Sequence, residues 1–319
     1  GSDTNDGKTL GTPVKTIAKA QELVKAIAGE TTDKDVTVYI RGGVYNLSER
    51  LMFGNEDSLA NGNTVTFKSY ENEKVYLSGG LALSDWTVHE GSIVKVHVPD
   101  AVNTRDLYVN GKPAVRARLT PEETRARISW GGGQQIVYQD GGTLANSQLS
   151  SIDDVEVVFK VLWNTYRSTF DTATVSGSAS VLTLDPAAYA VASWIPYGPT
   201  RYESAYVPVE QNIWYLENAM EFLDQPGEWY YNEDEKAIYY MLRDGETVEN
   251  LKAYAGISEI LIGSEPDAVI RNITFEGLTF CNTTWMRPER RGGYFTRQAG
   301  FYVLPDIFQD DLNYWQRPE

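Results

Sequence analysis

Four acidic residues lie within twelve positions in the last third of the chain and form its richest group of carboxyl side chains: Glu217, Glu221, Asp224 and Glu228. Two carboxyl groups, about 5–5.5 Å apart in retaining enzymes and ~6.5–9.5 Å apart in inverting ones, are the usual catalytic pair of glycoside hydrolysis. Glu221 and Asp224 are therefore our candidates for acid–base chemistry. The alternative is that Asp224 caps a turn, because turn aspartates usually satisfy local backbone groups.

The segment that carries these carboxyl groups predicts a short helix near residues 213–223, with Asn212 as its N-cap. On such a helix, Glu217 and Glu221 would share one face at i, i+4 spacing. Arg116 and Arg118 lie two residues apart on a predicted strand, so they would point to the same side of it. We expect these two arginines to form buried ion pairs with the acidic cluster.

An aromatic residue and a nearby arginine are the candidates for substrate binding. Trp285 could stack on a sugar face or pack against a neighbouring element, and Arg287 could hold the carboxylate of a uronate with two hydrogen bonds. Arg287 belongs to a basic cluster that either faces an acidic glycan or is a solvated loop. The cluster comprises Arg287, Arg290, Arg291 and Arg297.

The composition argues against several functional classes. The 319 residues carry a net charge of −16, whereas nucleic-acid partners require basic clusters. No apolar run approaches the ~20 residues of a membrane span. One cysteine, Cys281, and two histidines, His89 and His97, leave little material for zinc sites or Ser-His-Asp triads. We expect no cofactor and no metal site; calcium stays open only because residues 3–7 superficially resemble a calcium loop whose last glutamate is missing.

Two kinds of β pattern occur along the chain. After an amphipathic helix predicted at residues 13–28, short strands with polar or glycine corners extend to residue 84 and return in residues 256–319. Such strands, without helices between them, are typical of a β-solenoid. Residues 85–255 instead predict longer strands in hairpins, around Asn110-Gly111, at residues 172–184 and at residues 229–240. We therefore expect three parts, 1–84, 85–255 and 256–319, in which the middle one is a β-sandwich-like module inserted into the solenoid.

The motifs resemble those of bacterial carbohydrate-active proteins. Asp6-Gly7-Lys8 and Arg41-Gly42-Gly43-Val44-Tyr45 are similar to the opening of right-handed parallel β-helix proteins of the pectate-lyase-like superfamily. Residues 107–112, 221–230 and 272–278 narrow this resemblance to glycoside hydrolase family 141. The resemblance covers nearly the whole chain, and it is more specific for architecture than for substrate.

The resemblance implies an all-β fold, namely a right-handed parallel β-helix with an N-terminal capping helix and an inserted β-sandwich-like module. It also implies a secreted, periplasmic or cell-surface protein that processes plant cell-wall or similar polysaccharides, with an oligo- or polysaccharide as its partner. Family members continue for further coils that carry their proposed catalytic carboxylates. No catalytic residue is therefore transferred, and we expect this chain to be the N-terminal portion of a longer protein.

Two other functions stay open. A polysaccharide lyase of the same fold would need a calcium-binding aspartate cluster and an arginine or lysine base. A glycan-binding or adhesion protein would use the solenoid as a rigid stalk without catalysis.

Overall fold

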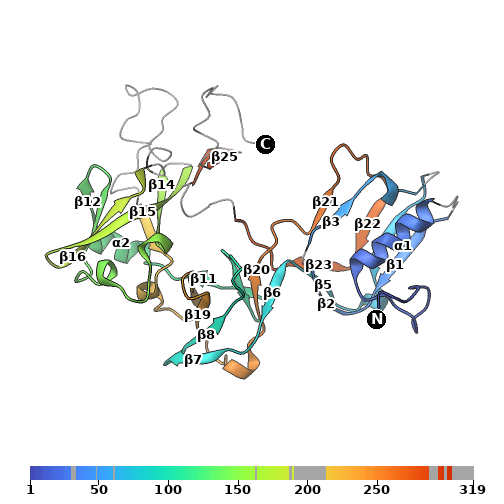
Figure 1. Cartoon of the computed structure of the whole chain (residues 1–319), viewed down its shortest axis with the longest axis horizontal. Helices are drawn as coiled ribbons and strands as arrows, with labels where there is room; N and C mark the ends of the chain where they lie inside the picture. Colours follow the sequence, from blue (N-terminus) through green and yellow to red (C-terminus); the bar gives the residue numbers. More distant parts are fainter. Residues whose placement is uncertain are drawn as a thin grey trace. The chain divides into compact units, whose positions relative to one another are not determined.

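The structure is a computed structural model that describes residues 1–29, 34–47, 49–59, 62–161, 164–186, 189, 213–286, 294–297 and 300–303. The described residues are mostly in β-strands, with two α-helices, α1 (Ile17–Gly29) and α2 (Pro121–Arg127) (Figure 1). The expected all-β class is therefore confirmed. Within this described part, no helix has both the length and the apolar character that a membrane crossing requires.

The chain divides into two compact units. The first unit comprises Gly1–Ala82, Thr104–Tyr108 and Tyr254–Trp285, and the second comprises Leu83–Asn103, Val109–Ala253 and Met286–Glu319. Short 3-10 helices occur in both units: η1 (Asn55–Asp57), η3 (Tyr70–Asn72), η4 (Leu144–Asn146), η5 (Ile152–Asp154), η7 (Met220–Phe222) and η8 (Val248–Asn250). The boundaries predicted after residues 84 and 255 stay predictions.

The first unit is built from parallel strand pairs. Its strands are β1 (Val36–Ile40), β2 (Gly43–Asn46), β3 (Leu51–Phe53), β4 (Val65–Ser69), β5 (Val75–Ser78), β21 (Ile262–Ser264), β22 (Ile273–Glu276) and β23 (Leu278–Cys281). They form sheets of order β1-β4-β22, β2-β5-β23 and β21-β3, and the neighbouring strands in each of these sheets are parallel. These pairings bring the last strands of the unit beside its first ones, although about 200 residues separate them in the sequence.

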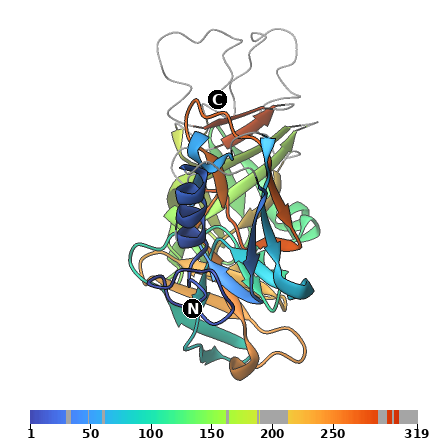
Figure 2. The same cartoon turned by 90° about the vertical axis from the view of Figure 1, so that its right-hand side faces the viewer.

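In-register side chains fill the core of the first unit. Val38 pairs with Phe67, which pairs with Phe275, and the two phenylalanine rings are stacked at 5.5 Å. Phe53 meets Phe67 edge to face at 5.8 Å. Helix α1, the dark blue helix in Figure 2, adds Ile17 to the same hydrophobic cluster. The amphipathic helix predicted from the sequence therefore covers β-structure, as expected.

Four strands lie where the chain passes from one unit into the other: β6 (Gly80–Leu83), β9 (Leu107–Val109), β10 (Lys112–Pro113) and β20 (Ala253–Gly256). Between β9 and β10, Asn110 and Gly111 both have positive φ, 51° and 74°. Two central residues with positive φ match the right-handed twist of the strands that they join. The hairpin predicted at this Asn-Gly pair is confirmed.

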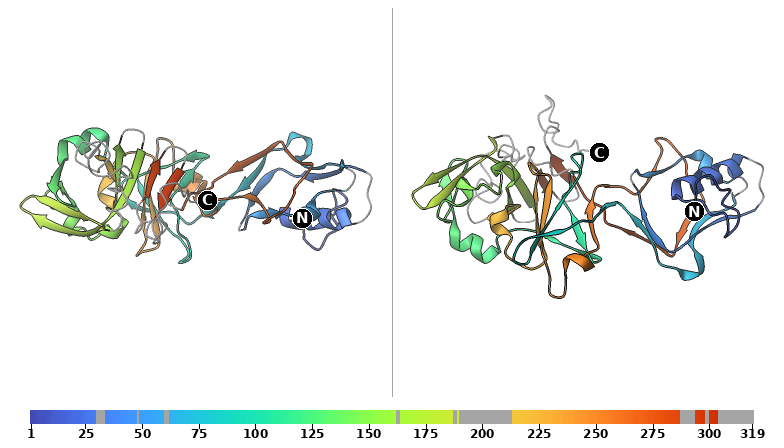
Figure 3. Two further views of the ribbon diagram at one scale, coloured as in Figure 1. Left: turned by 90° about the horizontal axis from the view of Figure 1, so that it is seen from above. Right: turned by 60° about the horizontal axis from the view of Figure 1, so that its bottom comes forward.

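Two sheets lie wholly within the described part of the second unit. Its strands are β7 (Thr87–Glu90), β8 (Ile93–His97), β11 (Val115–Arg116), β12 (Ile128–Gly132), β13 (Gln135–Tyr138), β14 (Glu156–Val161), β15 (Asn164–Ser176), β16 (Ala179–Leu184), β17 (Ile213–Glu217), β18 (Glu228–Asn232), β19 (Ala237–Met241), β24 (Tyr294–Arg297) and β25 (Gly300–Val303). The larger sheet has the order β12-β13-β16-β15-β14-β17, with β24 beside β15 and β25 beside β24. Its pairs are antiparallel, and the long hairpin of β15 and β16 is yellow-green in Figure 3.

The smaller sheet has the order β11-β18-β19-β8-β7, and its pairs are antiparallel except for β11 with β18. One hydrophobic cluster takes side chains from both sheets: Phe159 and Leu182 from the larger one, and Tyr230 and Tyr239 from the smaller one. The hairpins predicted around residues 172–184 and 229–240 are confirmed as β15–β16 and β18–β19.

The helix predicted near residues 213–223 is wrong. Residues 213–217 form strand β17, which pairs with β14, and only Met220–Phe222 turn as the short helix η7. Tertiary pairing with a neighbouring strand overrides the helical spacing of the apolar residues. Glu217 and Glu221 therefore do not share a helix face. Asn212 lies outside the described residues.

Replacing Thr120 with alanine is expected to lower the free energy of unfolding by about 1 kcal/mol, because Thr120 caps α2. Its hydroxyl accepts from Glu123 N at 3.2 Å, and Glu123 Oε2 accepts from Thr120 N at 2.8 Å. Urea denaturation followed by circular dichroism measures the change. Thr120→Ser keeps the hydroxyl and is the control; an equal loss in both variants would contradict the capping role.

Candidate functional site

The larger sheet of the second unit has two chemically different faces. Along β14, Val157 and Phe159 are fully buried and belong to the hydrophobic cluster. Because side chains alternate along a strand, Glu156, Val158 and Lys160 point to the opposite face. We call this the outer face, and it carries the candidate site.

The last residue of β11 and the short segment that follows it place two arginines on the outer face. Residues 117–119 run antiparallel to β17: Leu119 N donates to Leu216 O at 3.0 Å, and Asn218 N donates to Ala117 O at 2.7 Å. Ala117 and Leu119 are buried in the hydrophobic cluster. Arg116 and Arg118 alternate with them, so both point away from the core, as the period of two predicted.

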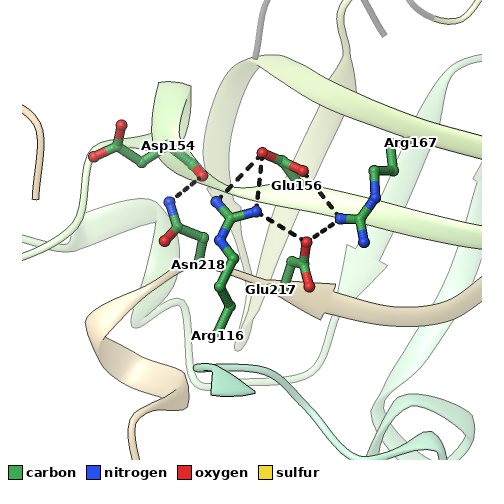
Figure 4. Close-up of polar contacts among 6 residues, drawn as sticks. All are labelled: Arg116, Asp154, Glu156, Arg167, Glu217 and Asn218. Carbon is green, nitrogen blue, oxygen red and sulfur yellow. Dashed lines mark hydrogen bonds and ion pairs between the residues drawn. The ribbon is translucent and has the colours of Figure 1, made fainter. Parts of the chain in front are cut away.

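Two buried glutamates lie directly opposite each other on adjacent strands of this sheet. Glu156 of β14 pairs directly with Glu217 of β17, and they are 2% and 3% exposed. Directly opposed like charges destabilise a sheet unless counter-charges lie between them. Arg116 and Arg167 provide those counter-charges and lie on either side of the two carboxylates (Figure 4).

The contacts within this group are close, and its formal charge is zero. Arg116 Nη1 lies 3.0 Å from Glu217 Oε1 and 3.3 Å from Glu156 Oε1. Arg167 Nη1 lies 3.2 Å from Glu156 Oε2 and also contacts Glu217 Oε1. Burial disfavours the charged guanidinium of Arg167, but the carboxylates of Glu217 and Glu156 more than offset this and raise its pKa. We call Arg116, Glu156, Arg167 and Glu217 the buried quartet.

The residue after β17 fixes the end of this strand. Asn218 is buried and has a left-handed φ of 65°, which asparagine tolerates better than most residues. Its Nδ2 donates to Asp154 O at 2.8 Å, as Figure 4 shows. The backbone of β17 is thus held on both sides just beyond Glu217.

The expected ion pairs are confirmed for Arg116 and wrong for Arg118. Arg118 is exposed, and within the described part of the chain it forms no ion pair with the acidic cluster. Its guanidinium instead lies 4.8 Å from the centroid of the Tyr215 ring. Tyr215 occupies the same face as Glu217, two positions along β17.

A β-bulge places two aromatic rings side by side on the outer face. Tyr215 pairs with Val158 and Ile213 pairs with Phe159, so Trp214 is the additional residue between them. The rings of Trp214 and Tyr215 are 5.4 Å apart, and Lys160 Nζ lies 4.5 Å from the centroid of the Trp214 ring. We call Arg118, Tyr215, Trp214 and Lys160 the exposed row, after its three exposed members; Tyr215 itself is buried, at 7% exposure.

The two catalytic candidates differ in environment. Glu221 lies in η7, where its Oε1 accepts from Ser147 Oγ and its Oε2 is buried without a hydrogen-bond partner among the described residues. Asp224 is exposed, and its Oδ1 accepts from Gln225 Nε2 at 3.1 Å. Their catalytic roles stay predictions.

Glu228, rather than Asp224, caps the turn that leads into β18. Its Oε2 accepts from Asp224 N at 3.3 Å and from Gln225 N at 3.2 Å. Burial raises the pKa of Glu228 to about 7, although the hydrogen bonds from Gln225 and Asp224 act in the opposite direction. The turn at Pro226-Gly227 is therefore fixed by a carboxyl group that follows it in the sequence.

Of the two predicted substrate-binding residues, the structure describes Trp285 and not Arg287. Trp285 belongs to the first unit and is 38% exposed. Arg287, Arg290 and Arg291 lie outside the described residues. Arg297 lies on β24, and its side chain is not described. The binding roles of Trp285 and Arg287 stay predictions.

The residues that resemble a calcium loop serve as backbone caps. Asp3 Oδ1 accepts from Lys15 N at 2.8 Å and Thr16 N at 2.9 Å, just before α1. Asp6 Oδ1 accepts from Thr12 Oγ1 at 2.7 Å. Among the residues that the structure describes, no group of three or more His, Cys, Asp or Glu side chains is arranged to hold a metal ion.

Sequence reasoning missed Lys160, Arg167 and Trp214. A signal was available for the lysine, because Glu156 and Lys160 flank three apolar residues, and a spacing of four positions places both on one face of a strand. The partnership of Arg167 with Glu217 spans 50 residues and has no local signal. The bulge at Trp214 likewise depends on pairing with another strand.

Comparisons with known proteins match this part of the chain to a carbohydrate-active family. Residues 92–243 match the family model of the GH141 insertion domain. This range of the chain includes the buried quartet and the exposed row. A solved structure titled "Glycoside hydrolase" is similar with a TM-score of 0.73 and 27% identity, over 92% of this chain and 51% of that one. The chain thus spans about half the length of that protein.

Two further matches are weaker. The uncharacterized protein YwoF of Bacillus subtilis (strain 168) is 31% identical over 126 residues, which are 40% of this chain and 23% of YwoF. A structure of XylC in complex with xylose has a TM-score of 0.37 and 14% identity, over 88% of this chain and 34% of that one. A likeness at that level carries no argument.

Proposed function

We propose that this chain is part of a bacterial glycoside hydrolase that processes a plant cell-wall or similar polysaccharide and acts in the periplasm, at the cell surface or after secretion. The similarity to a solved glycoside hydrolase over 92% of the chain, with a TM-score of 0.73, carries this proposal. The match of residues 92–243 to the GH141 insertion domain supports it independently of that structure.

In this proposal, the first unit is the beginning of a right-handed parallel β-helix whose N-terminal end is capped by α1. The parallel, in-register pairs of β1 with β4 and of β4 with β22 support this architecture, because a β-helix stacks equivalent strands of successive coils. The stacked rings of Phe67 and Phe275 are the inward ladder that such stacking produces. The second unit is then a module inserted between coils.

The proposed mechanism is acid–base catalysis by a carboxylate pair. Glu221 and Asp224 are the candidates within this chain, and carboxylates on coils of a longer parent protein are the alternative. We expect a full-length parent to release reducing ends from a panel of plant cell-wall glycans. Calcium-dependent release of unsaturated uronides would instead identify a lyase, and saturable binding without turnover would identify an adhesin.

In that parent, Glu221→Gln and Asp224→Asn are expected to lower kcat by about 10²–10⁴-fold if these residues are the pair, because each removes one acid–base group. Thermal unfolding of each variant tests whether the fold is retained. Glu122→Gln, which changes an exposed carboxyl group of α2, is the matched control. Full activity of both site variants would assign catalysis to other carboxylates of the parent.

A further inference from the structure

We infer that the outer face of the larger sheet binds a carboxylate-bearing saccharide, such as a uronate chain, through Arg118, Lys160 and Trp214. The choice of a saccharide as the ligand rests on the proposed function. The choice of an anionic one follows from the charges, the aromatic rings and the strand geometry of this face.

The outer face is positively charged in an acidic protein. Residues 116–118, 156–160, 165–169 and 213–217 together contain four cationic and two anionic side chains, whereas the whole chain has a net charge of −16. The buried quartet neutralises two cations against the two anions. Arg118 and Lys160 remain, and both are exposed. A local excess of positive charge attracts an anionic ligand and repels a cationic one.

These two cations are held in defined positions. Arg118 lies over the Tyr215 ring at 4.8 Å, and Lys160 lies over the Trp214 ring at 4.5 Å. Cation–π contacts restrict long side chains that would otherwise sample many rotamers. Because fewer rotamers are then lost when a ligand binds, the arrangement favours affinity. The planar guanidinium of Arg118 can also bind a carboxylate with two hydrogen bonds.

Trp214 adds an apolar contact between the two cations. It is 37% exposed although tryptophan is mostly buried in folded proteins, and the bulge in β17 is what turns it toward the outer face. An exposed indole presents a flat surface suited to the C–H face of a sugar ring. A neutral sugar would leave Arg118 and Lys160 unpaired, and a simple polyanion would not need the indole. A uronate uses both features.

The buried quartet positions this surface. Glu217 lies on β17 two residues after Tyr215, and its contact with Arg116 joins β17 to the segment that carries Arg118. Arg116 also contacts Glu156 of β14, the strand that carries Lys160, so the three elements that supply the exposed row are joined by the ion pairs of the quartet. Arg116 and Arg167 are positioning residues in this view and do not contact the ligand.

The test is a titration of the chain with unesterified polygalacturonate, followed by calorimetry and by affinity electrophoresis. We expect saturable binding, and no measurable binding of the same polymer after methyl esterification of its carboxyl groups. The Arg118→Gln/Lys160→Gln double variant and Trp214→Ala are each expected to weaken binding at least about tenfold. Lys112→Gln, which removes an exposed lysine of β10, is the matched control and should bind like the parent chain.

Three results would overturn the inference. The first is that the esterified polymer binds as tightly as the unesterified one. The second is that the Arg118, Lys160 and Trp214 variants keep both the parent's thermal unfolding and its affinity. The third is that dextran sulfate binds as tightly as polygalacturonate. Hydrolysis by the full-length parent is measured separately. If the parent hydrolyses glycans but the outer face does not bind polygalacturonate, only this inference is refuted. If the parent does not hydrolyse glycans but binding of polygalacturonate is lost in the variants, only the hydrolase proposal is refuted.

Discussion

Arg116→Met is expected to lower the free energy of unfolding of the second unit by about 3–5 kcal/mol, because it leaves two buried carboxylates with too few counter-charges. Glu156 and Glu217 are 2% and 3% exposed and face each other on paired strands. Without Arg116, Arg167 is the remaining arginine of the quartet, and it contacts both carboxylates. Methionine keeps the volume of the side chain, so the loss reports on charge more than on a cavity.

Urea denaturation followed by tryptophan fluorescence measures this loss, with the transition of the second unit analysed separately if the two units unfold in two steps. Arg118→Met is the matched control, since it removes the same group from an exposed position two residues away on the same segment. We expect the control to change stability by about 0.5 kcal/mol or less. Equal losses in both variants would contradict the electrostatic role of the quartet.

The Arg116→Met/Glu217→Gln double variant separates charge balance from packing. It restores a neutral group of Arg167 and Glu156, so we expect it to recover part of the loss. Recovery would show a coupling between the two positions. If the two losses simply add, Arg116 stabilises the sheet through packing rather than through the charge of Glu217.

The buried quartet also separates structural from catalytic carboxylates in this chain. Glu156 and Glu217 are buried, and each is contacted by both arginines of the quartet, whereas a general acid needs access to the substrate. Glu156 and Glu217 are therefore structural residues. Within the acidic cluster of the sequence, Glu217 thus has a structural role and Glu228 caps a turn, while the catalytic roles of Glu221 and Asp224 stay predictions.

Local sequence patterns correctly predicted the β-hairpins. The β15–β16 and β18–β19 hairpins and the Asn110-Gly111 turn were found because turn residues and flanking strands lie within a few positions of each other. The shared face of Arg116 and Arg118 followed from the period of two in a strand. In each case the interaction that decides the structure is local in sequence.

The rest of the candidate site could not be predicted because its contacts are not local. Arg116 and Glu217 are 101 residues apart, and β17 becomes a strand only because β14 pairs with it. Ile213, Leu216 and Met220 have helical spacing, so the sequence alone favoured the wrong element. The residues of the exposed row acquire their common face only through this pairing and its bulge.

Glu228→Gln is expected to stabilise the protein at neutral and alkaline pH, by up to about 3 kcal/mol near pH 8. The pKa of Glu228 is raised by burial from an ordinary value of 4.5 to about 7 in the folded protein. Between these two values the folded state binds more protons at this site than the unfolded state does. Stability therefore falls as pH rises from about 4.5 to about 7.

Glutamine removes this titration and keeps a side-chain oxygen that can accept from Asp224 N and Gln225 N, so the turn before β18 is retained. The stability gain of the variant should consequently be near zero at pH 4.5, grow through pH 7 and level off above it. The difference in stability between variant and parent cancels the contributions of all groups that behave alike in both proteins.

Chemical denaturation at several pH values between 4.5 and 8 measures this difference, with Glu122→Gln as the control for loss of an exposed carboxyl group. The control should differ from the parent by about 0.5 kcal/mol or less at each pH. A gain for Glu228→Gln that is the same at every pH would mean that the variant acts through packing. A loss of stability above pH 7 would mean that the charged carboxylate of Glu228 stabilises the fold through its hydrogen bonds to the turn. That result would contradict the prediction, because a pKa raised by burial requires that the charged form destabilise the folded state.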